Sequence, residues 1–216
     1  MDNLNFFVPS FSRVQSKWFL PERGITHFRN NLLFFIFLSF FCACTNEYTP
    51  KPRGFFRIDF PAKKYSDYNT GCPFVFQYPD YAIPVNDPDP GAEPCWINIE
   101  FPSFKATLHL SYKSLANNKL RSLTEDSRTL AMKHTIKAEE INERPFVTRN
   151  GIFGLMYDIK GNTASSVQFY LTDTLHNFIR GSLYFNVTPN ADSIAPVAEF
   201  INKDIDRFID TFRWKY

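Results

Sequence analysis

The sequence lacks the short motifs that mark common enzymes and nucleotide-binding proteins. It contains no G-x-S-x-G, H-E-x-x-H, G-x-G-x-x-G or Walker-type phosphate loop. It also has no polybasic run of the kind that grips nucleic acid or anionic lipid headgroups, so we expect no nucleic-acid partner. These absences favour a scaffold or binding module over an enzyme. We expect no catalysis, no cofactor, no metal and no small-molecule substrate.

The sequence also lacks an excess of acidic or basic residues outside the first part of the chain. The formal net charge is +2 at pH 7. The residues that produce this excess all precede Cys44: Arg13, Lys17, Arg23 and Arg29 against Asp2 and Glu22. Acidic and basic residues therefore balance in the remainder, which is long enough for one domain with a substantial core.

The apolar run at 32–41 is too short to cross a membrane. It has about ten residues, whereas a spanning helix needs roughly 20 and the apolar part of a signal peptide about 7–15. His27 and Arg29 precede it, and Ala43 and Cys44 follow it. This order of basic, apolar, small and cysteine residues is typical of a bacterial lipoprotein export signal.

Two cysteines compete for the lipid. Cys42 follows two phenylalanines, whereas Cys44 follows the small residue that a signal peptidase needs, so we predict lipidation at Cys44. Phe41 stands where leucine is more usual, and ordinary cleavage without lipidation stays open as an alternative. A diacylated, N-acylated Cys44, carrying palmitate-type chains, would hold the protein firmly at a membrane, because several acyl chains bind where one is marginal.

The leader sets the domain boundaries that we expect. Residues 1–43 form the leader and signal peptide, 44–54 the lipidated cysteine and a proline-containing tether, and 55–216 one folded domain. The first 25 residues exceed what most leaders need, so a misassigned start and a true extension both stay open. Little acidic charge follows Cys44, which favours a periplasm-facing domain. The choice between inner and outer membrane is open.

Alternating apolar and polar residues predict an antiparallel sheet. A single-domain α+β fold follows, with the sheet flanked by a central helix and a C-terminal helix. We expect strands at 55–60, 74–78, 96–101, 106–112, 137–143, 151–159, 165–172 and 178–187, a loop at 84–94, and turns at 160–162 and after Thr172. The central helical zone covers 114–134, with a stripe of Leu120, Leu123, Ser127, Leu130 and His134 and a second capped segment from Thr124. The C-terminal helix carries Ile194, Val197, Ile201, Ile205, Phe208 and Phe212, with Asp192 or Ser193 as N-cap.

Cys72 and Cys95 bracket the proline-rich loop in an oxidising compartment, and a disulfide between them is the favoured interpretation. Neither cysteine has a C-x-x-C or nearby histidine partner, which disfavours a metal site, and a catalytic thiol is equally disfavoured. The histidines of the expected domain, His109, His134 and His176, are scattered along the sequence. A catalytic histidine is therefore the least favoured hypothesis.

Two further patterns have a structural and a functional interpretation. A polar cluster surrounds Glu125 and His134, and we interpret it as a solvated helix face, with partner docking as the alternative. A second polar group consists of Asp158, Lys160 and Asn162, and we interpret it as a turn in preference to a site. The sequence also holds 25 Phe, 10 Tyr and 3 Trp, which indicates an aromatic core or, less favoured, an exposed aromatic surface that binds a glycan or lipid.

Several segments resemble the gliding-motility lipoprotein D family (GldD) of Bacteroidota, in order along nearly the whole expected domain. They are TPKPRGFFRIDFP (49–61), CPFVFQYP (72–79), CWINIEFP (95–102), HLSYKSL (109–115), EDSRTLAMKHTIKAEEI (125–141), GLMYDIKGNTASSVQFYLTD (154–173), FIRGSLYFNV (178–187) and FRW (212–214). The chain departs from the family pattern in its long leader and at Phe41.

The resemblance implies a cell-envelope lipoprotein required for gliding motility and tied to the type IX secretion machinery. It also implies a non-enzymatic role, with other envelope proteins of that machinery as partners. No family-wide binding residues can be carried over, so the site residues that we name are Cys44, Cys72 and Cys95. The order of elements is similar to Mog1/PsbP-like domains, which is an analogy at the level of the fold only.

Overall fold

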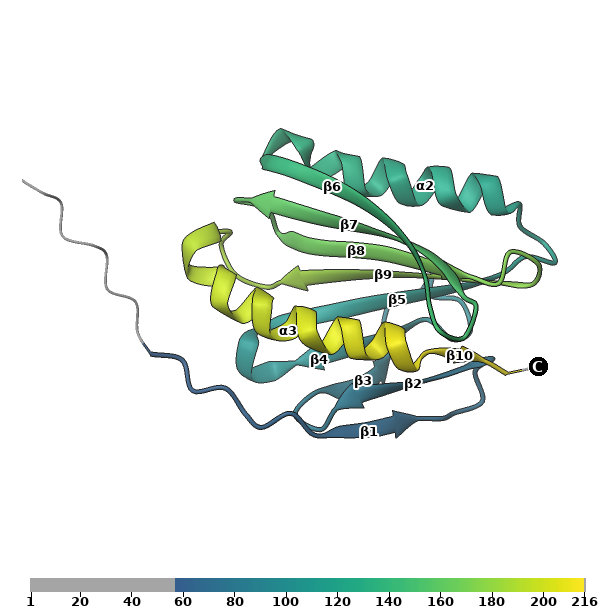
Figure 1. Cartoon of the computed structure of the whole chain (residues 1–216), viewed down its shortest axis with the longest axis horizontal. Coiled ribbons are helices and arrows are strands. Elements are labelled where there is room, and N and C mark those ends of the chain that lie inside the picture. The colour runs from purple at the N-terminus through teal and green to yellow at the C-terminus, as the bar shows by residue number, and fades with distance from the viewer. Residues whose placement is uncertain (1–56, 216) are drawn as a thin grey trace, which may run out of the picture. The chain divides into compact units, whose positions relative to one another are not determined.

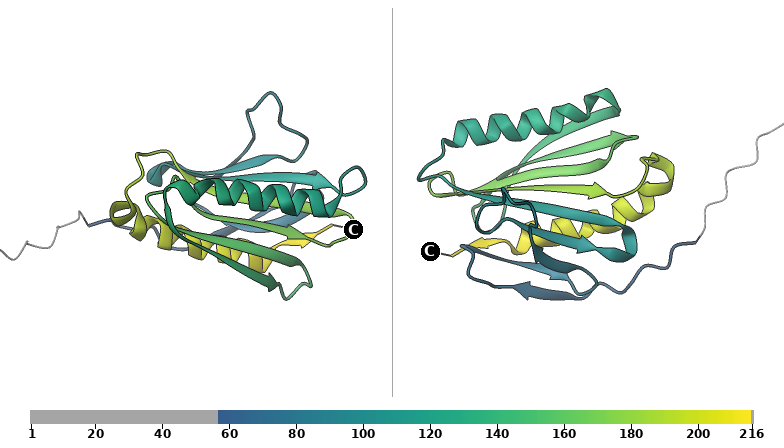
Figure 2. Two further views of the ribbon diagram at one scale, coloured as in Figure 1. Left: turned by 90° about the horizontal axis from the view of Figure 1, so that it is seen from above. Right: turned by 180° about the vertical axis from the view of Figure 1, so that it is seen from behind.

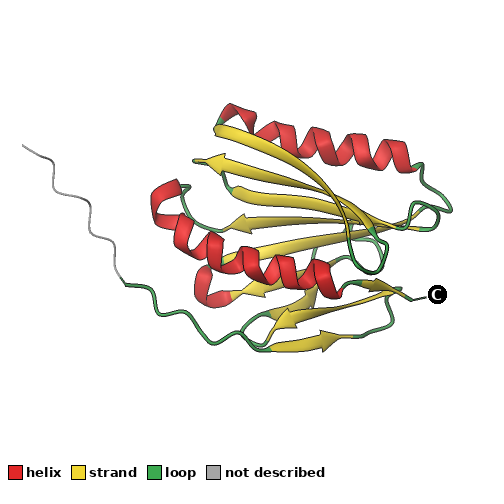
Figure 3. Ribbon diagram, in the orientation of Figure 1, coloured by secondary structure: helices red, strands yellow, loops and turns green. Residues whose placement is uncertain are grey.

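An antiparallel seven-stranded sheet organises the structure, with a smaller three-stranded sheet beside it (Figures 1 and 3). The computed structural model describes residues 57–215. These residues belong to a compact unit that spans Phe55–Tyr216. Antiparallel sheets and two α-helices within the described range confirm the α+β prediction. Cys44, the leader and the tether lie outside the described residues.

The elements of the described residues follow in chain order. They are β1 (Tyr65–Tyr68), β2 (Phe74–Pro79), β3 (Ile83–Asn86), β4 (Ile97–Phe101), η2 (Pro102–Phe104), β5 (Ala106–Ser114), α2 (Leu120–Met132), η3 (Lys133–Ile136), β6 (Ala138–Val147), β7 (Phe153–Gly161), β8 (Ser165–Thr172), β9 (Asn177–Phe185), α3 (Ala191–Thr211) and β10 (Arg213–Trp214). Within residues 57–215, no helix has the length and apolarity needed to span a membrane.

The large sheet has the order β3-β4-β5-β9-β8-β7-β6, and the small sheet has the order β1-β2-β10. Most neighbours in the large sheet follow one another along the chain as hairpins. The exception is the pairing of β5 with β9, which runs from Ala106–Phe185 to Ser114–Asn177 and joins the two halves of the sheet. The chain between those strands forms α2 and β6 to β8, so this central pairing has a long sequence separation.

The core lies between α3 and one face of the large sheet (Figure 1). Strand residues alternate, so that Leu108 and Leu110 of β5 face inward and are 2% and 1% exposed. The apolar stripe of α3 meets them, with Ile201, Ile205 and Phe208 fully covered. Each such side chain stabilises the fold by roughly 1.5–3 kcal/mol relative to an exposed position.

Aromatic side chains fill the end of this core next to the small sheet. The buried set is Phe74, Phe76, Phe101, Phe169, Phe208 and Phe212. The rings of Phe74 and Phe212 lie 5.7 Å apart, and those of Phe208 and Phe212 lie 5.5 Å apart, within the range of favourable ring pairs. Gly181 faces Phe169 across the β8–β9 pair, and a Cβ at that position would lie 2.2 Å from the Phe169 ring. The aromatic-core interpretation is confirmed.

The strand expected at 55–60 is wrong over its described residues, and the loop expected at 84–94 is wrong at its start. Residues 57–64 have no regular structure, and the first strand is β1. Phe60 stacks on the Phe200 ring of α3 at 4.3 Å instead of entering a ladder. The expected loop at 84–94 begins within β3, which tolerates Pro84 because β3 is an edge strand. The sequence did not predict β10, because a strand of two residues is too short to show apolar–polar alternation.

The helices are confirmed with local corrections. In α2 the buried positions are Ser127 and Ala131, whereas Leu130 is 37% exposed, so the packed stripe is rotated from the expected one. One helix runs through Thr124 without the second cap that we expected. In α3 the N-cap is Asn190, whose side chain accepts from the Ser193 amide at 3.2 Å, instead of Asp192 or Ser193. The other predicted strands are present, with ends that differ by a few residues.

Candidate functional site: the tether junction

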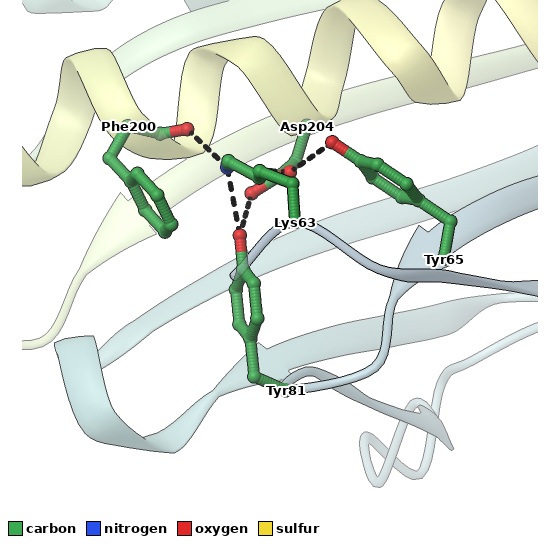
Figure 4. A network of polar contacts seen from close by, with 5 residues as sticks. All are labelled: Lys63, Tyr65, Tyr81, Phe200 and Asp204. Carbon is green, nitrogen blue, oxygen red and sulfur yellow. Dashed lines mark hydrogen bonds and ion pairs between the residues drawn. The ribbon is translucent and has the colours of Figure 1, made fainter. Parts of the chain in front are cut away.

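The first described residues lead from the predicted tether into the domain, and they are fastened to α3. We define the tether junction as Lys63, Tyr65, Tyr81, Phe200 and Asp204 (Figure 4). Lys63 precedes β1, Tyr65 begins β1, and Tyr81 lies between β2 and β3. The other two residues belong to α3. Two segments, one around Lys63 and Tyr65 and one at Tyr81, therefore converge on one side of this helix.

Asp204 is the centre of the tether junction and is only 3% exposed. Its Oδ1 accepts from the Tyr65 hydroxyl at 2.9 Å and from Lys63 Nζ at 2.7 Å. Its Oδ2 accepts from the Tyr81 hydroxyl. A buried carboxylate is tolerated when charges and hydrogen bonds compensate it, and both oxygens of Asp204 meet that requirement.

Lys63 is equally well compensated. Besides Asp204, its ammonium donates to the Tyr81 hydroxyl at 2.9 Å and to the Phe200 carbonyl at 2.8 Å. The ammonium also lies 3.4 Å from the centroid of the Phe200 ring, a cation–π contact. An ammonium has three N–H donors, and here three oxygens accept from it.

The environment fixes the protonation of these groups. Burial raises the pKa of Tyr65 to about 12, and the neighbouring Asp204 acts in the same direction. Burial and Asp204 also raise the pKa of Tyr81 far above its usual range. Both phenols therefore keep their protons near neutral pH and serve as donors. Burial lowers the pKa of Lys63, and its contact with Asp204 opposes that shift.

A disulfide restrains the strands next to the tether junction. Cys72 precedes β2 and Cys95 precedes β4, and the structure pairs them with a Cα–Cα distance of 5.6 Å. This is the pairing that the sequence analysis favoured. Their separation of 23 residues encloses β2, β3 and the proline-rich loop, so the bond restrains the strands that flank Tyr81.

The structure brings two of the three scattered histidines together. His109 and His134 have ring centroids 5.8 and 6.0 Å from the ring of Tyr184 on β9. Burial lowers the pKa of both, and the charge of Arg180 acts in the same direction, whereas Asp87 opposes the shift at His109. His176 lies apart, in the exposed turn between β8 and β9. Residues 57–215 hold no group of three or more His, Cys, Asp or Glu side chains arranged for a metal ion.

The polar clusters behave as surface features. On α2, Arg121 pairs with Glu125 at 2.8 Å, and both side chains are exposed. Lys160 pairs with Glu140 across the β6–β7 hairpin at 2.6 Å. Asn162 follows β7, and its side chain accepts from the Ala191 amide at the start of α3. These contacts are those of a solvated helix face and a turn.

Sequence reasoning missed the tether junction. Lys63 and Phe200 are 137 residues apart, and no spacing rule connects them. The one available signal is an acidic residue within the apolar stripe of α3: Asp204 directly precedes Ile205 and follows Ile201 by three positions. A carboxylate on the buried face of a helix needs a partner, but the sequence does not say which residue supplies it.

Fold and site together define a class: a disulfide-restrained α+β domain whose N-terminal segment is joined to its last helix by a buried ion-pair network. The sequence model of the gliding motility lipoprotein GldD family matches residues 45–214. The chain belongs to this family, which confirms the resemblance seen in the sequence and identifies a membrane-anchored envelope lipoprotein connected with gliding motility.

The chain is similar to the solution structure of cyanobacterial PsbP (CyanoP) from Synechocystis sp. PCC 6803, with 13% identity, a TM-score of 0.43, and coverage of 71% of this chain and 94% of that one. No curated protein matches the sequence. The fold class rests on the strands and helices described above.

Proposed function

We propose that the protein is a periplasm-facing structural or assembly component of the gliding and type IX secretion apparatus. It acts without catalysis, as a domain held at a membrane by lipid on Cys44. Its partners are other envelope proteins of that apparatus. Membership of the GldD family supplies the connection with gliding motility, and the type IX link, the partners and the non-catalytic role are what the resemblance to that family implies.

The tether junction is the observation that supports a structural role. A domain that only floats on a tether needs no specific contact between its first residues and its core. Here the segment next to the tether is joined to α3 by an ion pair whose carboxylate side chain is 2% exposed. Force on the anchor therefore reaches α3 and the large sheet directly. Such a connection suits a component that must hold its position in an assembly.

Variants of the histidines test the absence of catalysis. A hydrolase would need a general base, and His109 and His134 are the only described histidines that contact Tyr184. We expect the triple variant His109→Gln, His134→Gln, His176→Gln to support gliding as the unaltered protein does. Loss of gliding in a triple variant that is folded and present at normal amounts would contradict the non-catalytic role.

A second candidate, a lipoprotein that binds a glycan or lipid, has one specific location to be tested. Among residues 57–215 the aromatic side chains are buried or half-buried except Phe60 and Phe153, which weakens the argument for an aromatic binding surface. One open hollow of about 600 Å³ near the tip of the β6–β7 hairpin does contain Phe146, Phe153 and Tyr170. Phe153→Ser should leave gliding unchanged under our proposal and reduce it under the alternative.

A deletion strain tests the function itself. We expect that strain to lose spreading on agar and to stop secreting its usual type IX cargo. Complementation with the full chain should restore both, whereas Cys44→Ala should leave the protein in the soluble periplasmic fraction and restore neither. A deletion strain that spreads and secretes normally would overturn the proposal.

A further inference from the structure

A groove runs along the side of α3 opposite the tether junction. Two adjoining hollows form it, with volumes of about 730 and 490 Å³. The first is lined by Asn142 of β6, Asp158 of β7 and Asn202 of α3, and the second by Arg144, Met156 and Asp206 of the same elements. We call the pair the α3 groove. Figure 1 shows α3 crossing in front of the sheet, with the tip of the β6–β7 hairpin next to the C-terminal end of the helix, and Figure 2 gives two further views.

The two hollows are neighbours, because on each element a residue that lines one lies next on the same face to a residue that lines the other. Asn142 and Arg144 are alternate residues of β6, and Asp158 and Met156 are alternate residues of β7, so each pair lies on one face of the sheet. Asn202 and Asp206 are one helical turn apart on α3. The outer wall is β6, which is an edge strand paired only with β7 among the described strands. The groove is therefore open along its length.

The floor of the first hollow contains polar atoms without partners. Ser166 Oγ and Asn202 Oδ1 are both buried, and neither forms a hydrogen bond within the described residues. A register shift between Ser165 and Val167 aims Ser166 toward α3, as bulges commonly redirect a side chain. Unpaired buried polar groups are uncommon in folded proteins, and a ligand that supplies donors is one explanation for them.

The walls carry an excess of acidic charge. Asp206 and Asp210 lie one turn apart on α3, and neither forms an ion pair among residues 57–215. On the sheet side of the groove, Arg144 of β6 pairs with Asp158 of β7 at 3.7 Å. Burial raises the pKa of Asp206, and Asp210 and Asp158 raise it further against the opposing effect of Arg144. Across the two hollows six acidic residues (Glu139, Asp158, Asp192, Glu199, Asp206 and Asp210) stand against three basic ones (Arg144, Arg149 and Lys160), and a bound cation would relieve the remaining repulsion.

Small apolar residues complete the lining. Ala191, Ile194, Ala195 and Ala198 of α3 face the first hollow and leave room for side chains from outside. A ligand that matches the groove would thus be long, would carry positive charge for Asp206 and Asp210, and would bring N–H donors to Asn202. A polypeptide segment with Lys or Arg has all three properties, since each of its residues other than proline supplies a backbone N–H.

We propose that the α3 groove binds a basic segment of another envelope protein. The inference deepens the proposed structural role and rests on it, because it assigns the surface through which the anchored domain meets its partner. Lys and Arg side chains pair with Asp206 and Asp210, apolar side chains enter between Ala195 and the sheet, and backbone amides supply the donors missing at the floor. Electrostatic pairing of this kind sets partner choice and association rate.

Binding of defined peptides tests the chemistry. The probes are two fluorescent twelve-residue peptides, one alternating Lys and Val and the other Glu and Val, titrated against the full chain in detergent. We expect the Lys peptide to bind at least about tenfold more tightly, with an affinity that falls as salt is raised. Equal affinity for both peptides, or no binding of the Lys peptide, would overturn the proposal.

Matched variants locate the binding. Ala195 is exposed and lines the groove, so Ala195→Trp should fill it and weaken Lys-peptide binding at least about tenfold. Ser193 is exposed on the same helix but does not line the groove, so Ser193→Trp should bind as the unaltered chain does. Equal effects of the two substitutions would place the peptide elsewhere and contradict the assignment. Circular dichroism confirms that both variants are folded.

The same two variants separate this proposal from the proposed function. In a deletion strain, Ser193→Trp should restore spreading and Ala195→Trp should not. If both restore spreading while the deletion strain itself cannot spread, the groove proposal is wrong and the structural role stands. If the deletion strain spreads, the proposed function fails first. A photo-cross-linker at position 195 that captures glycan or lipid instead of protein would also overturn the groove proposal.

Discussion

The two sides of α3 differ in how they treat polar groups. Asp204 and Asn202 are two residues apart on the helix and point to opposite sides of it. Asp204 accepts from an ammonium and two phenols, so its carboxylate is fully compensated. Asn202 Oδ1 is buried with no partner in the described residues. On one side of the helix the buried polar group has its partners within the domain, and on the other side it has none among the described residues.

The difference separates a structural site from a candidate binding site. A buried network with all its hydrogen bonds stabilises one arrangement of the chain, whereas buried groups without partners reduce stability. Proteins keep such deficits where function requires them. We therefore assign the tether junction to holding the domain on its anchor and the α3 groove to meeting a partner.

Removing the central carboxylate should have the largest effect. Asp204→Ala leaves the Lys63 ammonium and two phenols without their acceptor, and breaking a buried ion pair costs about 3–5 kcal/mol. Because the Lys63 side chain is 26% exposed and can turn toward water, we expect a loss near 3 kcal/mol. Urea unfolding of the full chain in detergent measures it. A loss below about 1 kcal/mol would show that the junction contributes little.

Reduction of the disulfide should come next. Loss of the bond between Cys72 and Cys95, with 23 residues of separation, should cost about 3 kcal/mol in the chain-entropy model. The double variant Cys72→Ser, Cys95→Ser should show this loss under oxidising conditions and respond no further to reductant. The unaltered chain should approach the variant when reductant is added. Equal stability of the two oxidised proteins would contradict the restraint that we assign to the bond.

The histidines should give a smaller, pH-dependent effect. Burial lowers the folded-state pKa of His109 and His134, so below about pH 6.5 the unfolded chain binds more protons than the folded one. Stability should therefore fall as the pH drops from 7 toward 5.5. The double variant His109→Gln, His134→Gln should flatten this dependence, whereas His176→Gln, in the exposed turn, should keep it. A slope unchanged in the double variant would refute the assignment.

Changing the uncompensated side of α3 should have the smallest effect. Asn202→Leu removes a buried carbonyl that has no partner, so the unfolding free energy should change by less than about 0.5 kcal/mol or should rise. The comparison with Asp204→Ala, measured by the same urea titration, separates the two sides of one helix. A loss of more than about 1 kcal/mol would mean that Asn202 has a partner in solution.

Local signals predicted the elements better than their contacts. The stripe on α3 and the alternation in β5 locate a helix and a strand, because each needs only neighbouring residues. The pairing of Ala106 with Phe185 depends on the whole intervening chain, so the order of strands was out of reach. For the same reason the meeting of His109 with His134 could not be foreseen.

The tether junction and the disulfide show the same difference between local signals and long-range contacts. Cys72 and Cys95 could be paired from their compartment and their position beside strands, and the structure joins them. Lys63 looked like one of many surface lysines, and its role depends on Phe200 and Asp204, which are distant in sequence. Phe60 was assigned to a strand because alternation alone cannot distinguish pairing in a sheet from stacking on a helix.

A double-mutant cycle on Lys63 and Asp204 tests the central claim most directly. The variants Lys63→Met, Asp204→Asn and their combination would be unfolded in urea as full chains in detergent. If the tether junction fastens the anchored segment to α3, the cycle should give a coupling energy of about 1.5–3 kcal/mol. Additive losses, with a coupling below about 0.5 kcal/mol, would contradict the account, since the segment would then be held by other contacts.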